Sequence, residues 1–147
     1  MQKIPLEILN LQGDGYHLLV EVSLLNKTFK MVLDTGASKT VLDKQILLAN
    51  GITEEDLQHT DVVSTGLGTN SMQSFTLRLS EFQIASWSTK NFTAAVLDLS
   101  AINYAYEQME LPTVIGVLGG DILYHYGAKI DYRTASLSLR KRALKLK

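Results

Sequence analysis

Segment 29–38 reads FKMVLDTGAS, and it constrains the fold of this chain more than any other stretch. Its first half is an apolar run typical of a buried strand, and the run leads directly into Asp34. Small residues follow at once, which indicates a tight turn. A carboxylate buried at the end of a strand destabilises the fold unless it is paired, hydrogen-bonded or protonated. Asp34 is therefore either a satisfied turn residue or a working acid.

Alternation of apolar and polar residues predicts that the rest of the chain is mostly β. Strands are expected over residues 4–11, 17–25, 28–33, 74–84, 92–99, 128–132 and 137–139, with a hairpin turn at Asn26-Lys27. Helical spacing is confined to segments 39–50 before Gly51, 53–57, and 121–126 with Asp121 as its N-cap. No linker, repeat or low-complexity segment divides the 147 residues. We expect one all-β domain with short helices over residues 1–147.

Composition excludes several classes of protein. The chain has no cysteine, so a disulfide framework, a thiolate nucleophile and a Cys-ligated zinc site are excluded. A formal net charge of −1 gives no overall attraction for nucleic acid or for an anionic membrane. Polar residues interrupt every apolar run before the roughly 18 residues that a membrane span needs. The first residues lack the apolar stretch of a signal peptide, so a cytoplasmic location is the default expectation.

Metal and cofactor motifs are also missing from the sequence. His17, His59 and His125 are far apart and lack the His-x-x-x-His spacing of a helical metal site. Segment 66–71, GLGTNS, begins like a dinucleotide fingerprint but lacks the third glycine and lies between expected strands. We therefore expect no metal and no cofactor. We interpret segment 66–71 as a hairpin tip, which is either an ordinary turn or a flap over a binding site.

Basic residues gather at the C-terminus. A contact with nucleic acid or lipid is one interpretation, and a solvated chain end is the other. No aromatic residues are interleaved with the charges, which favours the solvated end. The residues concerned are Arg140, Lys141, Arg142, Lys145 and Lys147.

A second informative element lies at residues 114–123, VIGVLGGDIL. Two large aliphatic residues before a glycine, followed by a short helix, could pack beneath the turn that carries Asp34. Both Val114-Ile115-Gly116 and Val117-Leu118-Gly119 fit this pattern. The register of the element therefore has two readings from the sequence.

Together these segments resemble the retropepsin-like aspartic proteases, from about residue 15 to about residue 139. The resemblance is carried by Asp34-Thr35-Gly36-Ala37-Ser38, the glycine-bearing segment 66–71, Val117-Leu118-Gly119 with the following Asp121-Ile122-Leu123, and the terminal segment 130–139. The spacing is closer to the bacterial branch of this family than to the viral branch. The resemblance implies a closed β-barrel with short helices, and segment 103–112 is read as a family-variable insertion.

The chemistry of this family needs two carboxylates that share one proton and hold a water molecule between them. Two like charges about 3 Å apart cannot both ionise. The chain contains one Asp-Thr-Gly, so the resemblance implies that a second copy of the chain supplies the other Asp34. We expect a homodimer whose active site lies on its two-fold axis. By resemblance, the terminal strands of the two copies interleave.

The resemblance also assigns roles to the residues of the turn. Asp34 is the acid and base, Gly36 supplies a backbone N–H to the carboxylate, and Thr35 bonds across the dimer. Pepsin-like enzymes carry a hydroxyl where this chain has Ala37, so the dyad is expected to titrate at higher pH than in pepsins. Residues expected to contact the substrate are Ala37, Gly66, Leu67 and Gly68.

Three functions follow from this reading. The first is an aspartic endopeptidase that cleaves peptides or unfolded proteins. The second is a dimerisation or peptide-binding module of the same fold with little or no proteolytic activity, because a fold does not fix a function. The third is a ligand-binding barrel in which the Asp34 turn is a coincidence. The intact Asp34-Thr35-Gly36 favours the first, because a binding module has no need of an acid at a tight turn.

Overall fold

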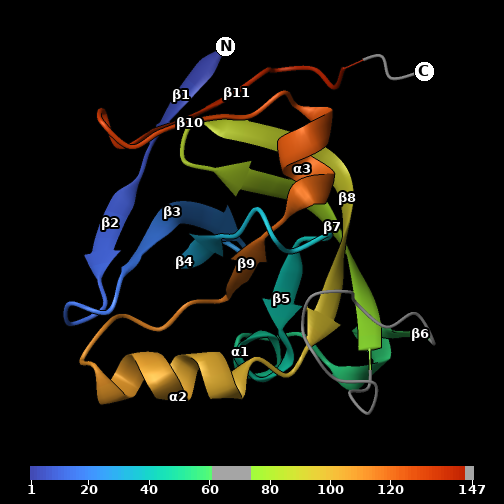
Figure 1. Cartoon of the computed structure of the whole chain (residues 1–147). Helices are drawn as coiled ribbons and strands as arrows, with labels where there is room; N and C mark the ends of the chain where they lie inside the picture. Colours follow the sequence, from blue (N-terminus) through green and yellow to red (C-terminus); the bar gives the residue numbers. More distant parts are fainter. Residues whose placement is uncertain (61–73, 145–147) are drawn as a thin grey trace.

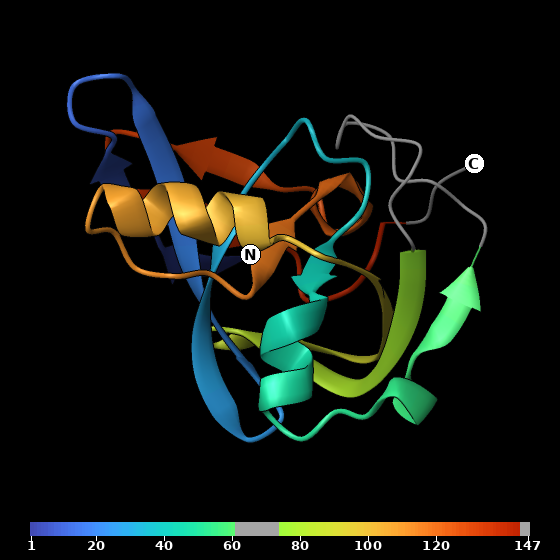
Figure 2. The ribbon, with the colours of Figure 1, turned by 90° about the horizontal axis from the view of Figure 1, so that it is seen from below.

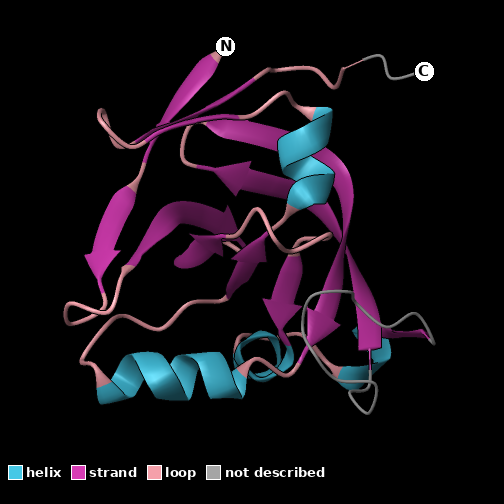
Figure 3. Ribbon diagram, in the orientation of Figure 1, coloured by secondary structure: helices cyan, strands magenta, loops and turns pink. Residues whose placement is uncertain are grey.

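The computed structural model describes residues 1–60 and 74–144, and strands predominate in it (Figures 1 and 3). The strands are β1 (Gln2–Pro5), β2 (Glu7–Asn10), β3 (Tyr16–Leu24), β4 (Lys27–Leu33), β5 (Val41–Asp43), β6 (Gln58–Thr60), β7 (Ser74–Ile84), β8 (Trp87–Leu97), β9 (Gly116–Leu118), β10 (Lys129–Asp131) and β11 (Ser136–Leu139). Segment 66–71, expected to form a hairpin tip or flap, lies outside the described residues, as do Lys145 and Lys147.

Eight of these strands form one sheet in the order β2-β3-β4-β9-β5-β8-β7-β6. A further pairing of β3 with β7 closes β3, β4, β9, β5, β8 and β7 into a barrel. Most neighbours in this sheet are antiparallel, but β4 with β9 and β5 with β8 are parallel. The expected closed β-barrel with short helices is confirmed.

A separate three-stranded sheet has the order β1-β11-β10 and carries the two ends of the described chain (Figure 1). The single strand expected over residues 4–11 is wrong, because β1 belongs to this sheet and β2 to the barrel sheet. Ile4 is paired with Leu137, whereas Leu9 is paired with His17. The chain crosses between the sheets at Leu6, whose N–H donates to the carbonyl of Ala135 at 2.8 Å. Both halves are extended, so alternation in the sequence continues across the break.

The long hairpins explain most of the barrel. β3 and β4 are joined through Leu25 and Asn26, which both have positive φ (55° and 60°), as a tight two-residue hairpin turn requires. The turn therefore lies one residue earlier than Asn26-Lys27. β8 begins at Trp87 rather than at residue 92, because its first half pairs with the second half of β7, from Leu79 to Ile84.

Four short helices accompany the strands in the described residues: α1 (Lys44–Ala49), η1 (Glu54–Asp56), α2 (Ser100–Gln108) and α3 (Gly120–His125). The helix expected over residues 39–50 starts only at Lys44, because Val41–Asp43 are taken into the barrel as β5. It ends as expected, since Gly51 has a φ of +101° and the N–H of Ile52 donates to the carbonyl of Leu47. Segment 103–112, read as a variable insertion, contains most of α2.

Two hydrophobic cores result from the alternation along the strands. The main core fills the barrel and the space between it and the small sheet. The second core lies on the other face of β3, β4, β5 and β9. Buried members of the main core include Val20, Met31, Leu33, Leu42, Phe82, Trp87 and Leu118. Buried members of the second core are Leu9, Leu19, Val32, Ala37, Val41, Leu97, Leu99, Tyr106, Val114 and Val117.

Candidate active site

The Asp34 turn arches over the end of a strand that comes much later in the chain. β4 and β5 are consecutive in sequence but are not neighbours, because β9 lies between them. The connection from Asp34 to Thr40 therefore has to pass over the C-terminal end of β9 (Figures 1 and 2). Asp34 N–H donates to the carbonyl of Leu118 at 3.0 Å, and Gly120 N–H donates to the carbonyl of Ala37 at 2.8 Å. These bonds fix the turn on β9.

The carboxylate of Asp34 is half-buried and is held by its own turn. Its Oδ1 accepts the N–H of Gly36 at 2.9 Å. A Cβ at position 36 would lie 3.3 Å from that oxygen, so glycine allows this close approach. Thr35 and Gly36 are exposed next to it. Asp34 is thus a satisfied turn residue that still presents a carboxylate at the surface.

The contacts of β9 remove the ambiguity of register. Val32 is paired with Val117 and Leu33 with Leu118, so Val117-Leu118-Gly119 is the triplet beneath the turn. A Cβ on Gly119 would lie 2.4 Å from the carbonyl oxygen of Lys39, which explains the glycine there. Gly116 is as tightly placed, because a Cβ there would lie 1.9 Å from the carbonyl oxygen of Val41, but it lies at the start of β9. The sequence fitted both registers because Gly116 and Gly119 are three residues apart and each follows two aliphatic residues.

A buried hydroxyl joins the turn to α3. The Oγ1 of Thr40 accepts the N–H of Gly119 at 3.1 Å and donates to Oδ1 of Asp121 at 2.7 Å. The same Asp121 oxygen accepts the N–H of Thr40 and that of Ile122. The expectation that Asp121 caps α3 as its N-cap is wrong, because the N-cap is Gly119. Asp121 instead lies in the first turn of α3 and anchors the end of the Asp34 turn.

Strand alternation places Asp34 on the side of the second core. Val32 belongs to that core, and residues two apart on a strand share a face. By the same rule His17 lies on the face of Leu19, which is also in the second core. Ala37, expected to contact substrate, is 6% exposed and belongs to this core as well. The ends of β3 and β4 thus meet on one face around Asp34.

Helix α2 covers this face (Figure 2). Its buried Asn103 donates to the carbonyl of Val114 at 2.9 Å and accepts the N–H of Val114 at 2.8 Å. The N–H of Leu99, at the start of the helix, donates to Oδ1 of the buried Asp43 at 2.8 Å. Oδ2 of Asp43 accepts the N–H of Ile46 in α1. These bonds fix α2 against the strands.

Tyr106 of α2 and His17 of β3 are two residues of this region that no sequence motif assigned to the site. Tyr106 is 3% exposed, and its hydroxyl lies 2.5 Å from Nδ1 of His17. Burial raises the pKa of Tyr106, and the negative charge of Asp34 raises it further. The spacing of Ile102, Tyr106 and Met109 is a helical signal that indicates an apolar face here. No sequence signal indicates that this face meets Asp34.

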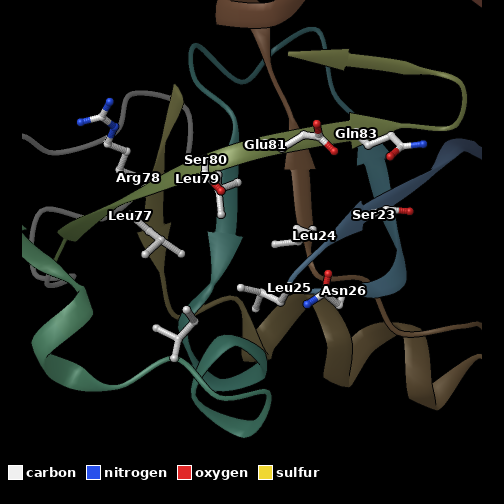
Figure 4. Close-up of a pocket in the computed structure, with 11 residues that line it drawn as sticks. Ser23, Leu24, Leu25, Asn26, Leu77, Arg78, Leu79, Ser80, Glu81 and Gln83 are labelled. Atoms are coloured by element: carbon white, nitrogen blue, oxygen red, sulfur yellow. The ribbon is translucent and has the colours of Figure 1, made fainter. Parts of the chain in front are cut away.

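One pocket of the surface lies away from the Asp34 turn. A pocket of about 450 Å³ lies between the β3–β4 hairpin and β7, and Figure 4 shows the side chains that line it. None of its lining residues belongs to the Asp34 turn. It mixes apolar Leu24, Leu77 and Leu79 with exposed polar ends of Asn26 and Arg78. This pocket is separate from the candidate active site.

The described residues contain no group of three or more His, Asp or Glu side chains that could hold a metal ion. The three histidines have separate contacts: His17 with Tyr106, His59 with Phe75, and His125 with the carbonyl of Asp121. Within residues 1–60 and 74–144, no helix is long and apolar enough to span a bilayer. The arrangement is therefore one carboxylate at a tight turn, without a metal cluster beside it in these residues.

Comparison with known proteins agrees with this geometry. A family profile described as aspartyl protease matches residues 20–122. The structure is similar to the retroviral protease-like domain of Ddi1 from Leishmania major, with a TM-score of 0.60 and 17% identity over 84% of this chain and 87% of that one. It is also similar to a retropepsin-like aspartic protease from Rickettsia conorii, with a TM-score of 0.56 and 24% identity over 97% and 98% of the two chains. No curated protein matches the sequence.

Proposed function

The chain belongs to the retropepsin-like aspartyl protease family, and on this premise we propose that it is a homodimeric aspartic endopeptidase with one such domain per chain. Asp34 of each copy supplies one carboxylate of the catalytic dyad. The observation that carries the proposal is the half-buried Asp34 carboxylate, held by the N–H of Gly36 beside an exposed Thr35. A reacting carboxylate needs this combination of a fixed position and an open side.

The second carboxylate has to come from another copy, because Asp-Thr-Gly occurs once in the sequence. A two-fold axis beside Asp34 brings two identical turns together in an isologous contact. Among the described residues, β1 and β10 pair only with β11 and leave the outer edges of the small sheet open. β1 is paired with β11 within its own chain. The interleaving of the terminal strands that the resemblance implies stays a prediction, and an open edge of the small sheet is where a strand of the second copy would pair.

In the proposed reaction, the two carboxylates share one proton and hold a water molecule. The ionised member accepts a proton from the water as it attacks the peptide carbonyl, and the protonated member donates toward the carbonyl oxygen. No covalent intermediate with the enzyme forms. The Gly36 N–H donates to Oδ1 of Asp34 and so holds this carboxylate in a fixed position.

The substrate is a peptide or an unfolded segment of a protein. An extended peptide can bind by adding a strand to a strand edge. Gly66, Leu67 and Gly68, which lie outside the described residues, remain proposed substrate contacts. Ala37 offers no hydroxyl to the carboxylates, so one donor that would stabilise their charge is lacking. We therefore expect activity at mild pH, above the acidic range of pepsins.

The test is cleavage of a diverse peptide library across pH by the wild type, Asp34→Asn and Asp14→Asn. Asp14 is an exposed aspartate in the β2–β3 turn and serves as the matched control. We expect cleavage by the wild type and by Asp14→Asn, inhibition by a statine-type compound, and loss of cleavage in Asp34→Asn. A peak of activity confined to strongly acidic pH would contradict the assignment made from Ala37.

The oligomeric state is measured in parallel by analytical ultracentrifugation. We expect a dimer for the wild type and for Asp34→Asn. A folded dimer that cleaves nothing at any pH would favour the second function, a dimeric peptide-binding module. A wild-type protein that cleaves peptides as a strict monomer would overturn the proposal of a dyad shared between two copies.

A further inference from the structure

One edge of β7 is only partly occupied by its neighbours (Figure 1). β8 pairs with the other edge from Phe75 to Ile84. On the partly occupied edge, β6 pairs with residues 74–76, and β3 pairs with Gln83 and Ile84. No described strand pairs with residues 77–82 on this edge, and the turn and loop hydrogen bonds of the described chain do not involve residues 78–81. The wall of the barrel therefore contains a short open strand edge at residues 77–82.

A groove runs along this open edge. Two pockets of about 450 Å³ each adjoin it, and they share Ile52, Leu77 and Arg78. One pocket extends to the β3–β4 turn, and the other extends to Gln58 of β6. The groove thus spans the distance between the two strands that flank the open edge. None of the residues that line it belongs to the Asp34 turn.

The groove has an apolar floor and a polar rim. Leu24, Leu77 and Leu79 line it and are buried members of the main core. Arg78 and Glu81 are exposed. Figure 4 shows Leu77 and Arg78 on opposite sides of β7. A segment that lies along this edge therefore faces apolar side chains with one side and water with the other, as an added strand does.

The rim carries two opposite charges three residues apart. Nη2 of Arg78 donates to Oδ1 of Asn91 at 3.1 Å, and no carboxylate of the described residues forms an ion pair with Arg78. Glu81 is opposite Lys90 in the register of β7 and β8, but no ion pair of the described residues includes Glu81. Opposite charges directly across two strands stabilise their pairing. The open edge is therefore complementary to a strand with an acidic residue opposite Arg78 and a basic residue opposite Glu81.

The surroundings of the open edge distinguish an extended partner from a folded one. β6 and the β3–β4 turn flank the edge at its two ends, so the long edge of another sheet cannot lie flush against residues 77–82. A second folded copy of this chain is therefore a poor fit. A single extended segment of six residues, which is about 20 Å long, matches the open length.

We propose that residues 77–82 bind one extended segment of a partner protein, which adds a short strand between β6 and β3. β6 and β3 are both antiparallel to β7, so the added strand is antiparallel as well. In this mode of binding, main-chain hydrogen bonds supply affinity and alternate side chains supply selectivity. The segment selected here has apolar residues over the floor, a basic residue opposite Glu81 and an acidic residue opposite Arg78. The site is separate from the Asp34 turn, so its binding does not depend on the proposed function.

The first test measures the binding of a labelled peptide by fluorescence anisotropy. The probe is Val-Lys-Ser-Val-Glu-Val with both ends blocked, and its antiparallel register places lysine opposite Glu81 and glutamate opposite Arg78. The matched probe Val-Glu-Ser-Val-Lys-Val has the same composition with the two charges exchanged. Asp34→Asn is the protein used, so that the proposed peptidase activity cannot consume the probes. We expect the first probe to bind roughly fivefold more tightly than the second at low salt. Equal binding of the two probes, or binding of neither, would overturn the proposal.

An exchange of charges in the protein locates the preference. The double variant Arg78→Glu with Glu81→Arg keeps the net charge, and we expect it to prefer the second probe over the first. The matched control exchanges two exposed charges elsewhere, Glu107→Arg with Arg133→Glu, and is expected to keep the original preference. A double variant at Arg78 and Glu81 that still prefers the first probe would contradict charge pairing at this edge.

Pairing through the backbone is tested without changing the groove. The first probe is N-methylated at alternate residues in the two possible phases, and only one phase removes the N–H groups that point to β7. We expect one phase to abolish binding and the other to keep it. Backbone amide shifts measured by NMR are expected to change most at residues 77–82. Equal effects of the two phases, or shift changes centred on the Asp34 turn, would refute strand addition here.

These outcomes are independent of the proposed function. Absence of cleavage by the wild type would refute the proposed function and leave the binding of the probe unchanged. An oligomeric state that changes in Arg78→Glu with Glu81→Arg, measured by analytical ultracentrifugation, would identify a second copy as the occupant and refute the peptide site. A double variant that fails to fold is recognised by its circular dichroism, and the N-methylated probes with the amide shifts then decide the proposal.

Discussion

The two cores of this protein differ in whether a titratable side chain is among their buried members. The main core contains apolar side chains without a titratable group among its buried members, and its one indole donates to the backbone carbonyl of Arg140 at 2.9 Å. The second core is smaller and includes the phenol of Tyr106. β4 contributes to both, with Met31 and Leu33 on one face and Val32 on the other.

This difference separates stability from chemistry within one sheet. An apolar core stabilises the barrel in proportion to the area that it buries, whatever the pH. A core that contains a phenol, touches an exposed imidazole and adjoins a carboxylate responds to protons. The same strands therefore hold the fold together on one face and set the environment of Asp34 on the other.

The largest effect is expected from a cavity in the main core. Phe82 is fully buried and stacks on Phe92 with ring centroids 5.5 Å apart. Phe82→Ala should lower the free energy of unfolding by about 3–5 kcal/mol. Urea unfolding followed by the fluorescence of Trp87 measures this, since Trp87 is the single tryptophan and belongs to the main core.

Because Phe82 belongs to the main core and not to the core beside Asp34, we expect the folded fraction of Phe82→Ala to keep the wild-type pH profile of cleavage. Exposed Tyr104→Phe serves as a control for both readouts. A shifted pH profile of cleavage in Phe82→Ala would mean that the two cores are not independent.

A smaller effect is expected where the Asp34 turn meets β9. A Cβ on Gly119 would meet the carbonyl carbon of Lys39 at 2.5 Å, so Gly119→Ala has to displace the turn. We expect a loss of about 3 kcal/mol in stability and a large loss of cleavage. Gly120→Ala is the matched control, because its Cβ would lie at an ordinary 3.4 Å from the carbonyl oxygen of Ala37. Equal behaviour of the two variants would contradict the close packing.

Loosening α2 is expected to affect the second core alone. Asn103→Ala leaves the N–H and carbonyl of Val114 without their partners, and we expect a loss of about 2 kcal/mol. Amide hydrogen exchange should increase within α2 and stay unchanged in β7 and β8. Gln108→Ala, an exposed change near the end of the same helix, is the control. An equal increase of amide exchange in α2, β7 and β8 of Asn103→Ala would contradict the independence of the two cores.

The smallest effect is expected on the free energy of unfolding at alkaline pH. The pKa of Tyr106 is raised above its ordinary value of 10.0, so the folded state holds the phenol proton more tightly than the unfolded state does. The folded state then binds more protons than the unfolded state above about pH 10, and stability falls as the pH rises through that window. Denaturation over an alkaline series from about pH 9 to about pH 12 measures the slope. Tyr106→Phe should reduce it and Tyr104→Phe should not, and an unchanged slope in Tyr106→Phe would refute this assignment.

Local pattern was sufficient for much of the fold. The apolar run into Asp34 predicted a strand that ends there in a tight turn, and β4 ends at Leu33. The family resemblance, and not the local pattern, predicted the hydrogen bond from the Gly36 N–H to Asp34, which is present. The long strands β3, β4 and β7 followed from alternation. Alternation failed at Leu6, where the chain changes sheets without changing conformation, and at Val41, where apolar spacing fits both a helix and a short strand.

The sequence by itself determined which residues of each strand share a face, and hence that Asp34 lies with Val32. Only the tertiary structure decided that β9 lies between β4 and β5, and that Tyr106 meets His17 across 89 residues. The physical reason is the range of the interactions. Strand alternation and tight turns depend on neighbours along the chain, whereas the insertion of a strand and the docking of a helix depend on contacts that no local pattern contains.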